Sequence, residues 1–192
     1  DGLGEQTIDQ ILAERSIPLT GFADIYRLHA HRDALLKLDR MGEKKLENML
    51  KGIERSKSRG LSRVLAGMGI RHLGDSTARA LCRLFANLDD LLGASEEQLR
   101  PKTLKKERAL EFGFAAEPTA RPETGLGAIT AAVVRDYLHS LEASQIFAGL
   151  RAAGVDLTSR EFRSAQDPAA IERRFQPLAI VLTGTLTSMG RD

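Results

Sequence analysis

The 192-residue sequence has few residues suited to cross-linking, metal binding or membrane insertion. It holds one cysteine, no tryptophan and 5% aromatic residues. The single Cys82 excludes an intrachain disulfide and a cysteine-based zinc cluster within this sequence. No run of about 18 apolar residues occurs, so we expect no membrane span. The chain starts at Asp1 without methionine or signal peptide, which favours a piece of a longer cytoplasmic protein.

Charge is unevenly distributed along the chain. The net charge is +2, but residues 37–83 carry twelve Lys or Arg against five acids, a net +7, which leaves −5 elsewhere. A local basic block of this kind is typical of a surface that binds a polyanion. A solvated, charge-rich helical face explains the same distribution, and charge alone does not separate the two interpretations.

Apolar residues recur at helical spacing in several segments, which favours a mostly α fold. We interpret each of these stripes as part of a hydrophobic core. They comprise Ile8, Ile11 and Leu12; Leu46, Met49, Leu50 and Ile53; and Ala78, Leu81, Leu84 and Phe85. A further helix is expected from about Ala128 to Leu138, and another from Glu142 to Ala153 that ends at Gly154.

A short turn with a hydrophobic residue before glycine precedes four of these helices. The turns are GLG at 2–4, RMG at 40–42, HLG at 72–74 and GLG at 125–127. Successive final glycines lie 38, 32 and 53 residues apart, which indicates an internal repeat. The long third interval contains the polar, Pro-bounded stretch 101–122, interpreted as an insertion or mobile loop; without it about 33 residues remain.

A glycine turn that opens a helix can bind an anion, because the first backbone N–H groups of a helix have no intrahelical partner. Glycine also permits close approach of a phosphate. Hydroxyl and ammonium groups just past the turns add donors that position a protein on a nucleic acid without reading its sequence. The candidate phosphate-binding residues are Gly2, Gly4, Gly42, Lys44, Lys45, His72, Gly74, Ser76, Thr77, Arg79, Gly125, Gly127 and Thr130.

The sequence changes character after the last predicted helix. Residues 156–177 are polar, contain two prolines and are expected to form a linker. The apolar, β-branched run LAIVL at 178–182 predicts a buried strand. Because a lone strand cannot bury itself, we expect residues 178–192 to begin a second, truncated domain.

Taken together, these strings resemble one family, the bacterial NAD-dependent DNA ligases. LDRMGEK at 38–44 and GIRHLGDSTA at 69–78 are similar to the family's second and third helix-hairpin-helix motifs. LRAAGV at 150–155 resembles the helix that closes that domain, and VLTGTL at 181–186 resembles the first strand and turn of a BRCT domain. The resemblance implies four tandem helix-hairpin-helix repeats over 1–155, a linker over 156–177 and the start of an α/β BRCT domain at 178–192.

The resemblance also implies a division of labour within a larger enzyme. The family transfers AMP from NAD to a lysine in a Lys-x-Asp-Gly motif, and this sequence has no such motif. The chain alone is therefore expected to bind nicked double-stranded DNA without ligating it. NAD, Mg and Zn are expected in the adenylation, OB and zinc-finger domains of the parent, and this chain is expected to bind none of them. A monomer in the bacterial cytoplasm, associated with the nucleoid, follows from the same resemblance.

Two alternatives remain from the residues themselves. The hairpins are also compatible with another repair or recombination protein, and with a helical scaffold that binds protein instead of DNA. His72 either contacts a phosphate or caps its turn. Cys82 is interpreted as inert core, and His29 with His31 lacks a third ligand at metal-site spacing.

Overall fold

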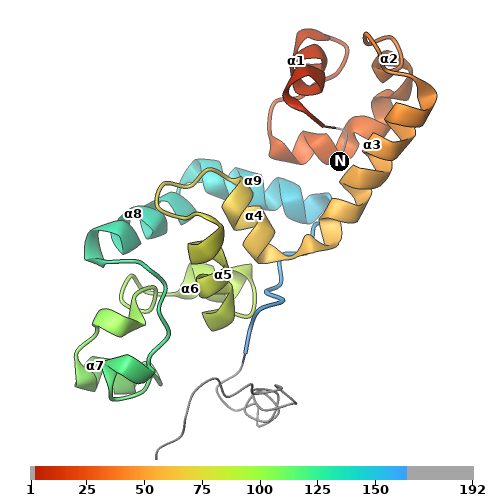
Figure 1. The fold of residues 1–192 in the computed structure, drawn as a ribbon. Helices are drawn as coiled ribbons and strands as arrows, with labels where there is room; N and C mark the ends of the chain where they lie inside the picture. The colour runs from red at the N-terminus through yellow and green to blue at the C-terminus, as the bar shows by residue number, and fades with distance from the viewer. Residues whose placement is uncertain (1–2, 164–192) are drawn as a thin grey trace, which may run out of the picture. The chain divides into compact units, whose positions relative to one another are not determined.

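Helices supply almost all the regular structure in the part of the chain that is described. The structure is a computed structural model that describes residues 3–163 (Figure 1). The elements are α1 Glu5–Ala13, η1 Phe22–His31, α2 Arg32–Leu35, α3 Glu43–Ser56, η2 Lys57–Arg59, α4 Leu61–Gly67, α5 Asp75–Leu84, α6 Leu88–Gly93, η3 Pro101–Thr103, α7 Lys106–Glu111, η4 Pro118–Ala120, α8 Ala128–Leu138 and α9 Leu141–Ala152. Within this part the β structure is one isolated bridge, between Asn87 and Thr158. The mostly α prediction is confirmed there, and no helix in it is long and apolar enough to cross a bilayer.

The helices enclose two hydrophobic cores. The first forms between α1, η1, α2 and α3, where Ile11, Leu35, Leu46 and Met49 have no exposed surface. The second forms between α4, α5, α6, α8 and α9. Burying each such leucine or isoleucine contributes on the order of 2 kcal/mol. The first and second glycine turns pack against the first core, and the third and fourth turns pack against the second.

Most of the predicted apolar stripes lie in these cores. Leu46, Met49 and Ile53 of α3 are buried, as are Ala78 and Leu81 of α5. The stripe on α1 is wrong for two residues, because Ile8 and Leu12 are exposed and only Ile11 is buried. The difference arises because the first core meets one narrow face of this nine-residue helix.

The two ends of the α8–α9 hairpin follow the sequence prediction closely. Helix α8 spans Ala128–Leu138, as expected, and α9 ends just before Gly154. Gly154 has φ +76° and its N–H donates to the Arg151 carbonyl, while the Val155 N–H donates to the Leu150 carbonyl. These paired bonds form the glycine-terminated C-cap called a Schellman motif.

Helix α9 lies close to η1, and Gly149 makes the approach possible. A Cβ on Gly149 would stand 2.7 Å from the Cβ of Ala23. Tyr26, also on η1, packs against both hydrophobic cores. The contact between η1 and α9 therefore connects the helices around the first core with those around the second. It does so through Gly149, Ala23 and the Tyr26 ring.

The segment 101–122 differs from the predicted loop. It contains η3, α7 and η4, and Pro101, Leu104 and Ala109 are buried. Arg121 is buried as well, and its guanidinium donates to the carbonyls of Pro101, Leu104, Ala115 and Ala116. One arginine thus satisfies carbonyls that short helical turns leave without partners.

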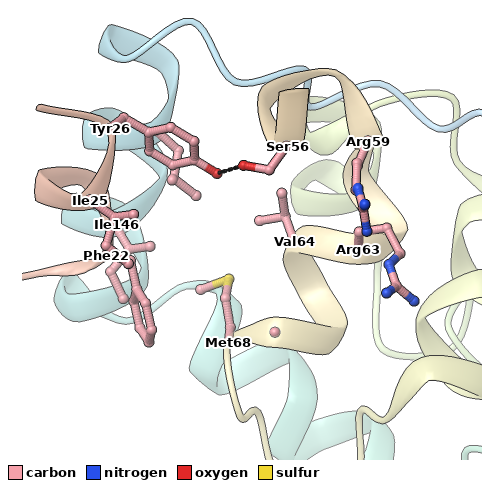
Figure 2. Close-up of a pocket in the computed structure, with 11 residues that line it drawn as sticks. Phe22, Ile25, Tyr26, Ser56, Arg59, Arg63, Val64, Met68 and Ile146 are labelled. Atoms are coloured by element: carbon pink, nitrogen blue, oxygen red, sulfur yellow. Dashed lines mark hydrogen bonds between the residues drawn. The ribbon is translucent and has the colours of Figure 1, made fainter. Parts of the chain in front are cut away.

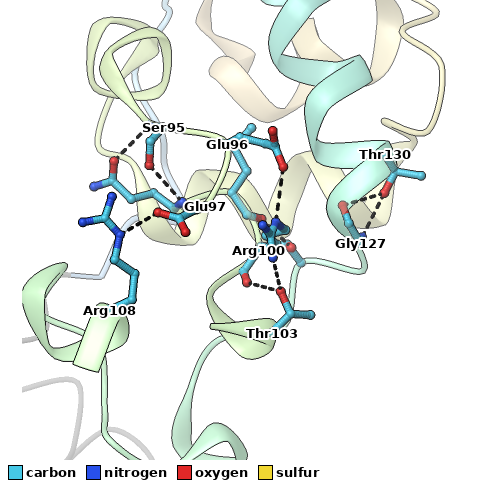
Figure 3. A network of polar contacts seen from close by, with 11 residues as sticks. Ser95, Glu96, Glu97, Arg100, Thr103, Arg108, Gly127 and Thr130 are labelled. Atoms are coloured by element: carbon cyan, nitrogen blue, oxygen red, sulfur yellow. Dashed lines mark hydrogen bonds and ion pairs between the residues drawn. The ribbon is translucent and has the colours of Figure 1, made fainter. Parts of the chain in front are cut away.

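Polar contacts extend from the start of this segment (Figure 3). Arg108 on α7 donates to Glu97 and to Glu111, both at 2.6 Å. Arg100 donates to the Thr103 hydroxyl at 2.9 Å. Local patterns did not reveal the contact of Arg108 with Glu97, because it joins residues eleven apart that belong to different elements.

The chain that follows α9 also departs from the linker prediction. Leu157 is buried, its carbonyl accepts from the Leu88 N–H, and the Asp156 N–H donates to the Lys57 carbonyl at 2.8 Å. The helical unit accordingly extends to Phe162 instead of ending at residue 155. The rest of the predicted linker and the strand predicted at 178–182 lie outside the described residues.

Candidate nucleic-acid interface

The final glycines of the four turns share one backbone conformation. Gly4, Gly42, Gly74 and Gly127 have φ between −82° and −90° with extended ψ, and each is the N-cap of the helix that follows. The carbonyl of each glycine accepts from the N–H four residues later at 2.9–3.0 Å. All four glycines are exposed. The four glycines thus share one local geometry, and the number of complete repeats stays a prediction.

The first residue of the turn has a left-handed backbone wherever the structure describes it. Arg40 has φ +55°, His72 +66° and Gly125 +77°. Arginine and histidine therefore take the conformation that glycine takes in the fourth turn, at an intrinsic cost of about 1 kcal/mol each. Gly2, the corresponding residue of the first turn, lies outside the described residues.

The hydrophobic residue in the middle of each turn anchors it to a core. Met41, Leu73 and Leu126 are buried, and Leu3 packs against the first core. The N–H of Met41 donates to the Leu38 carbonyl and that of Leu73 to the Ile70 carbonyl. This anchoring holds the exposed glycine and the helix start at a fixed position on the surface.

No side-chain oxygen caps α1, α3 or α5 at its glycine N-cap. Their first-turn N–H groups therefore face solvent beside exposed glycine, and the helix dipole adds positive potential there. At α8 the Thr130 hydroxyl accepts from the Gly127 N–H at 2.9 Å and donates to the Gly127 carbonyl at 3.2 Å (Figure 3). Thr130 is thus already engaged within its own turn.

The predicted donors differ in how available they are. Lys44 and Lys45 in the first turn of α3 are exposed, and neither has a carboxylate within 4.0 Å among residues 3–163. Ser76 and His72 are exposed too. Thr77 is half-buried, and Arg79 is bound to Asp75. The structure therefore leaves Lys44, Lys45, Ser76 and His72 the most accessible of the predicted side chains.

The third and fourth turns lie beside one another. The Thr77 hydroxyl oxygen stands 3.8 Å from where a Cβ on Gly125 would be. Leu73 and Leu126, from the middle of these turns, belong to the same core. The first and second turns share the other core through Leu3 and Met41. The third and fourth turns are thus adjacent, and the first and second turns are anchored in the same core.

Residues 63–101 match the family described as the helix-hairpin-helix motif. The match is confined to this segment of the chain. The matched residues comprise most of α4, the third turn, α5 and α6.

Over its whole length the chain is also similar to DNA ligases of bacteria. It is 38% identical over 192 residues to a DNA ligase of Brevibacillus brevis, 35% to one of Anoxybacillus flavithermus and 34% to one of Symbiobacterium thermophilum. All 192 residues are covered in each comparison, and they span about a quarter of the relative's length. The chain is thus related to one segment of these enzymes.

The acids at the start of the helices were not singled out by sequence. The first helical residue is Glu5, Glu43 or Asp75 after three of the turns and Ala128 after the fourth. Arg32 lies 3.3 Å from Glu43. Arg63 and Arg79 lie 3.1 Å and 2.9 Å from Asp75. An acid at a helix start is stabilising but competes with a phosphate for the same N–H groups, so these arginines reduce a local repulsion. The acid that directly follows the final glycine in three of the four turns is the sequence pattern that could have indicated these residues.

Other candidate chemistry is absent from the described part of the chain. No three His, Cys, Asp or Glu side chains gather there as metal ligands. Cys82 is buried, as predicted, and burial raises the pKa of its thiol to about 11. A thiol with that pKa is almost entirely protonated at neutral pH and is a poor nucleophile. In the described part of the chain, neither a metal site nor the Cys82 thiol therefore offers an alternative functional site to the glycine turns.

Proposed function

We propose that this chain is the DNA-gripping part of an NAD-dependent DNA ligase and binds duplex DNA without sequence preference. The observation that carries the proposal is the repeated geometry of exposed, glycine-capped helix starts, each anchored by an apolar residue that packs against a core. The match to the helix-hairpin-helix motif and the similarity to DNA ligases support it.

In this proposal all four turns act as helix-hairpin-helix motifs. Each helix start donates backbone N–H groups to a phosphate oxygen, and Lys44, Lys45, Ser76 and His72 add side-chain contacts. Because phosphates are equivalent at every base step, such contacts position the protein and carry no base information. Pairing of the third and fourth turns places two donor sets at one surface, which suits the two strands that border a groove.

The remaining parts of the proposal concern the parent enzyme. Nick sealing, the use of NAD and Mg, a zinc finger, and the adenylation and OB domains belong to chain outside these 192 residues. A BRCT domain begins at residue 178, the protein acts as a monomer, and it works in the bacterial cytoplasm at the nucleoid. The chain itself supplies affinity for the nicked duplex and no catalytic group.

The test is binding of the 192-residue chain to intact and nicked duplexes across a salt series. We expect log K to fall linearly with log salt, with a slope of roughly −0.9 per phosphate contact. Little dependence on base sequence is expected, and tighter binding to the nicked duplex supports the ligase. Absence of binding at low salt contradicts the proposal and favours a helical scaffold. Equal affinity for a nick and a branched junction favours another repair or recombination protein.

A further inference from the structure

Three arginines and one acid lie together beside the third glycine turn. The Asp75 carboxylate accepts from Arg63 of α4 through one oxygen at 3.1 Å and from Arg79 of α5 through the other at 2.9 Å. Arg59, at the end of η2, lines the same cavity as Arg63 and has no carboxylate within 4.0 Å among residues 3–163. These four side chains therefore carry three positive charges against one negative charge.

The Arg59 and Arg63 side chains point to the same side of α4. Figure 2 shows both guanidinium groups directed away from the apolar space between Phe22 and Met68. Because Arg63 ends at the Asp75 carboxylate, this side is the one that faces the start of α5. Both arginines are exposed. The two guanidinium groups thus reach solvent next to the third turn and do not enter the cavity.

The backbone that carries Arg59 is held on both sides by the segment after α9. Before it, the Lys57 carbonyl accepts from the Asp156 N–H at 2.8 Å. After it, the Leu61 N–H donates to the Thr158 carbonyl, also at 2.8 Å. A side chain on a fixed backbone loses less conformational freedom when it binds a ligand. Arg59 is therefore presented from a defined place on the surface.

This excess of positive charge favours an anion from outside the described residues. Arg63 and Arg79 share a single carboxylate, and Arg59 has none. Like charges close together repel, so an anion placed beside Arg59 and Arg63 lowers the electrostatic energy of the group. Guanidinium groups bind phosphate oxygens through paired N–H donors. Because Asp75 directly follows the exposed Gly74, a phosphate chain bound at this turn passes within reach of the same arginines.

We infer that Arg59 and Arg63 bind a backbone phosphate of DNA next to the phosphate bound at the start of α5. The inference rests on the proposed DNA-binding function and extends its interface to η2 and α4. Every predicted donor of the third hairpin lies in or after its turn, whereas these two arginines lie before it. Asp75 holds Arg63 toward α5 in the free chain, and Arg59 supplies the charge that no acid offsets.

The test is binding of the 192-residue chain to a labelled duplex across a salt series. Arg59→Gln should make the slope of log K against log salt shallower by roughly 0.9 and weaken binding about fivefold at about 0.1 M salt. Arg59→Lys keeps the charge and should keep the slope. The matched control is Arg15→Gln, because Arg15 is exposed and follows the end of α1 opposite its glycine turn. This control should leave the slope unchanged.

Two further measurements separate the possible outcomes. Urea unfolding should give Arg59→Gln the stability of the unsubstituted chain, so that its weaker binding reports a lost contact. Arg63→Gln should lower the slope as Arg59→Gln does and weaken binding further, because Asp75 then keeps one partner only. Absence of salt-dependent binding by the unsubstituted chain contradicts the proposed function itself. If that chain binds but Arg59→Gln and Arg15→Gln give the same slope, this inference is overturned and the proposed function stands.

Discussion

The Arg79 guanidinium donates to the Asp75 carboxylate at 2.9 Å, so this predicted phosphate ligand is held by an acid on its own helix. The other oxygen of Asp75 accepts from Arg63 at 3.1 Å. Asp75 is the first residue of α5 and stands where a phosphate bound at that helix start would approach. The pair thus stabilises the free hairpin and must loosen for Arg79 to contact a phosphate.

Replacing this acid should strengthen DNA binding. Asp75→Asn removes one negative charge at the helix start and frees two arginines, so we expect the affinity for duplex DNA to rise about fivefold at low salt, equivalent to about 1 kcal/mol. Fluorescence anisotropy with a short labelled duplex measures it. Asp136→Asn, near the far end of α8, is the control; an equal gain there means that net charge alone is responsible.

The left-handed residues of the turns should show opposite effects on stability. His72→Gly relieves the backbone at φ +66° and should raise the free energy of unfolding by about 0.5–1 kcal/mol. Gly125→Ala at φ +77° should lower it by about 1 kcal/mol, since its nearest neighbour is 3.8 Å away and steric clash is not the cause. Urea unfolding measures both. A loss of stability in His72→Gly would show that the imidazole itself holds the turn.

The two exposed lysines of α3 should account for part of the salt dependence of binding. Replacing Lys44 and Lys45 by alanine should make the slope of log K against log salt shallower by roughly 0.9 for each lost phosphate contact. Lys51→Ala is the matched control, because Lys51 lies on the same helix and pairs with Glu47 at 2.8 Å. If all three substitutions change the slope equally, the α3 turn has no special part in binding.

The close approach of α9 to η1 should tolerate one methyl group but not two. Gly149→Ala places two Cβ atoms 2.7 Å apart and should destabilise the chain by about 1–3 kcal/mol. Adding Ala23→Gly removes the opposing methyl and should restore most of the loss. A double-mutant cycle from thermal or urea unfolding gives the coupling, and additive effects of the two substitutions would exclude the contact as the cause.

Arg121 should contribute substantially to the stability of the segment 101–122, although it lies in a polar stretch of sequence. Arg121→Met removes the donor shared by four main-chain carbonyls and should destabilise the segment 101–121 by about 2–4 kcal/mol. Amide hydrogen exchange should show faster exchange confined to this segment if it opens independently. Lys105→Met, an exposed residue at the start of α7, should leave exchange unchanged.

Local sequence patterns determined helices α1, α3, α5, α8 and α9 and the turns before four of them. The stripe on α3, the glycine at the end of α9 and the four glycine N-caps depend on residues within one or two turns of each other, so periodicity and glycine position were sufficient to predict them. The candidate glycines were predictable as helix starts, and their contact with phosphate stays a prediction. Every predicted glycine within the described residues lies at the position that the pattern gave it.

Tertiary structure alone decided which residues meet. The pairing of Thr77 with Gly125, the link from Arg63 to Asp75 and the closeness of Gly149 to Ala23 join different helices. The order of residues 101–122 likewise depends on Arg121, which reaches carbonyls up to 20 residues away. The sequence of a helix shows which of its faces is apolar, but it does not show which other helix packs against that face. That choice follows from packing of the whole chain, and it decides contacts such as that of Arg63 on α4 with Asp75 on α5, whereas the pairing of Arg79 with Asp75 is local to one helix.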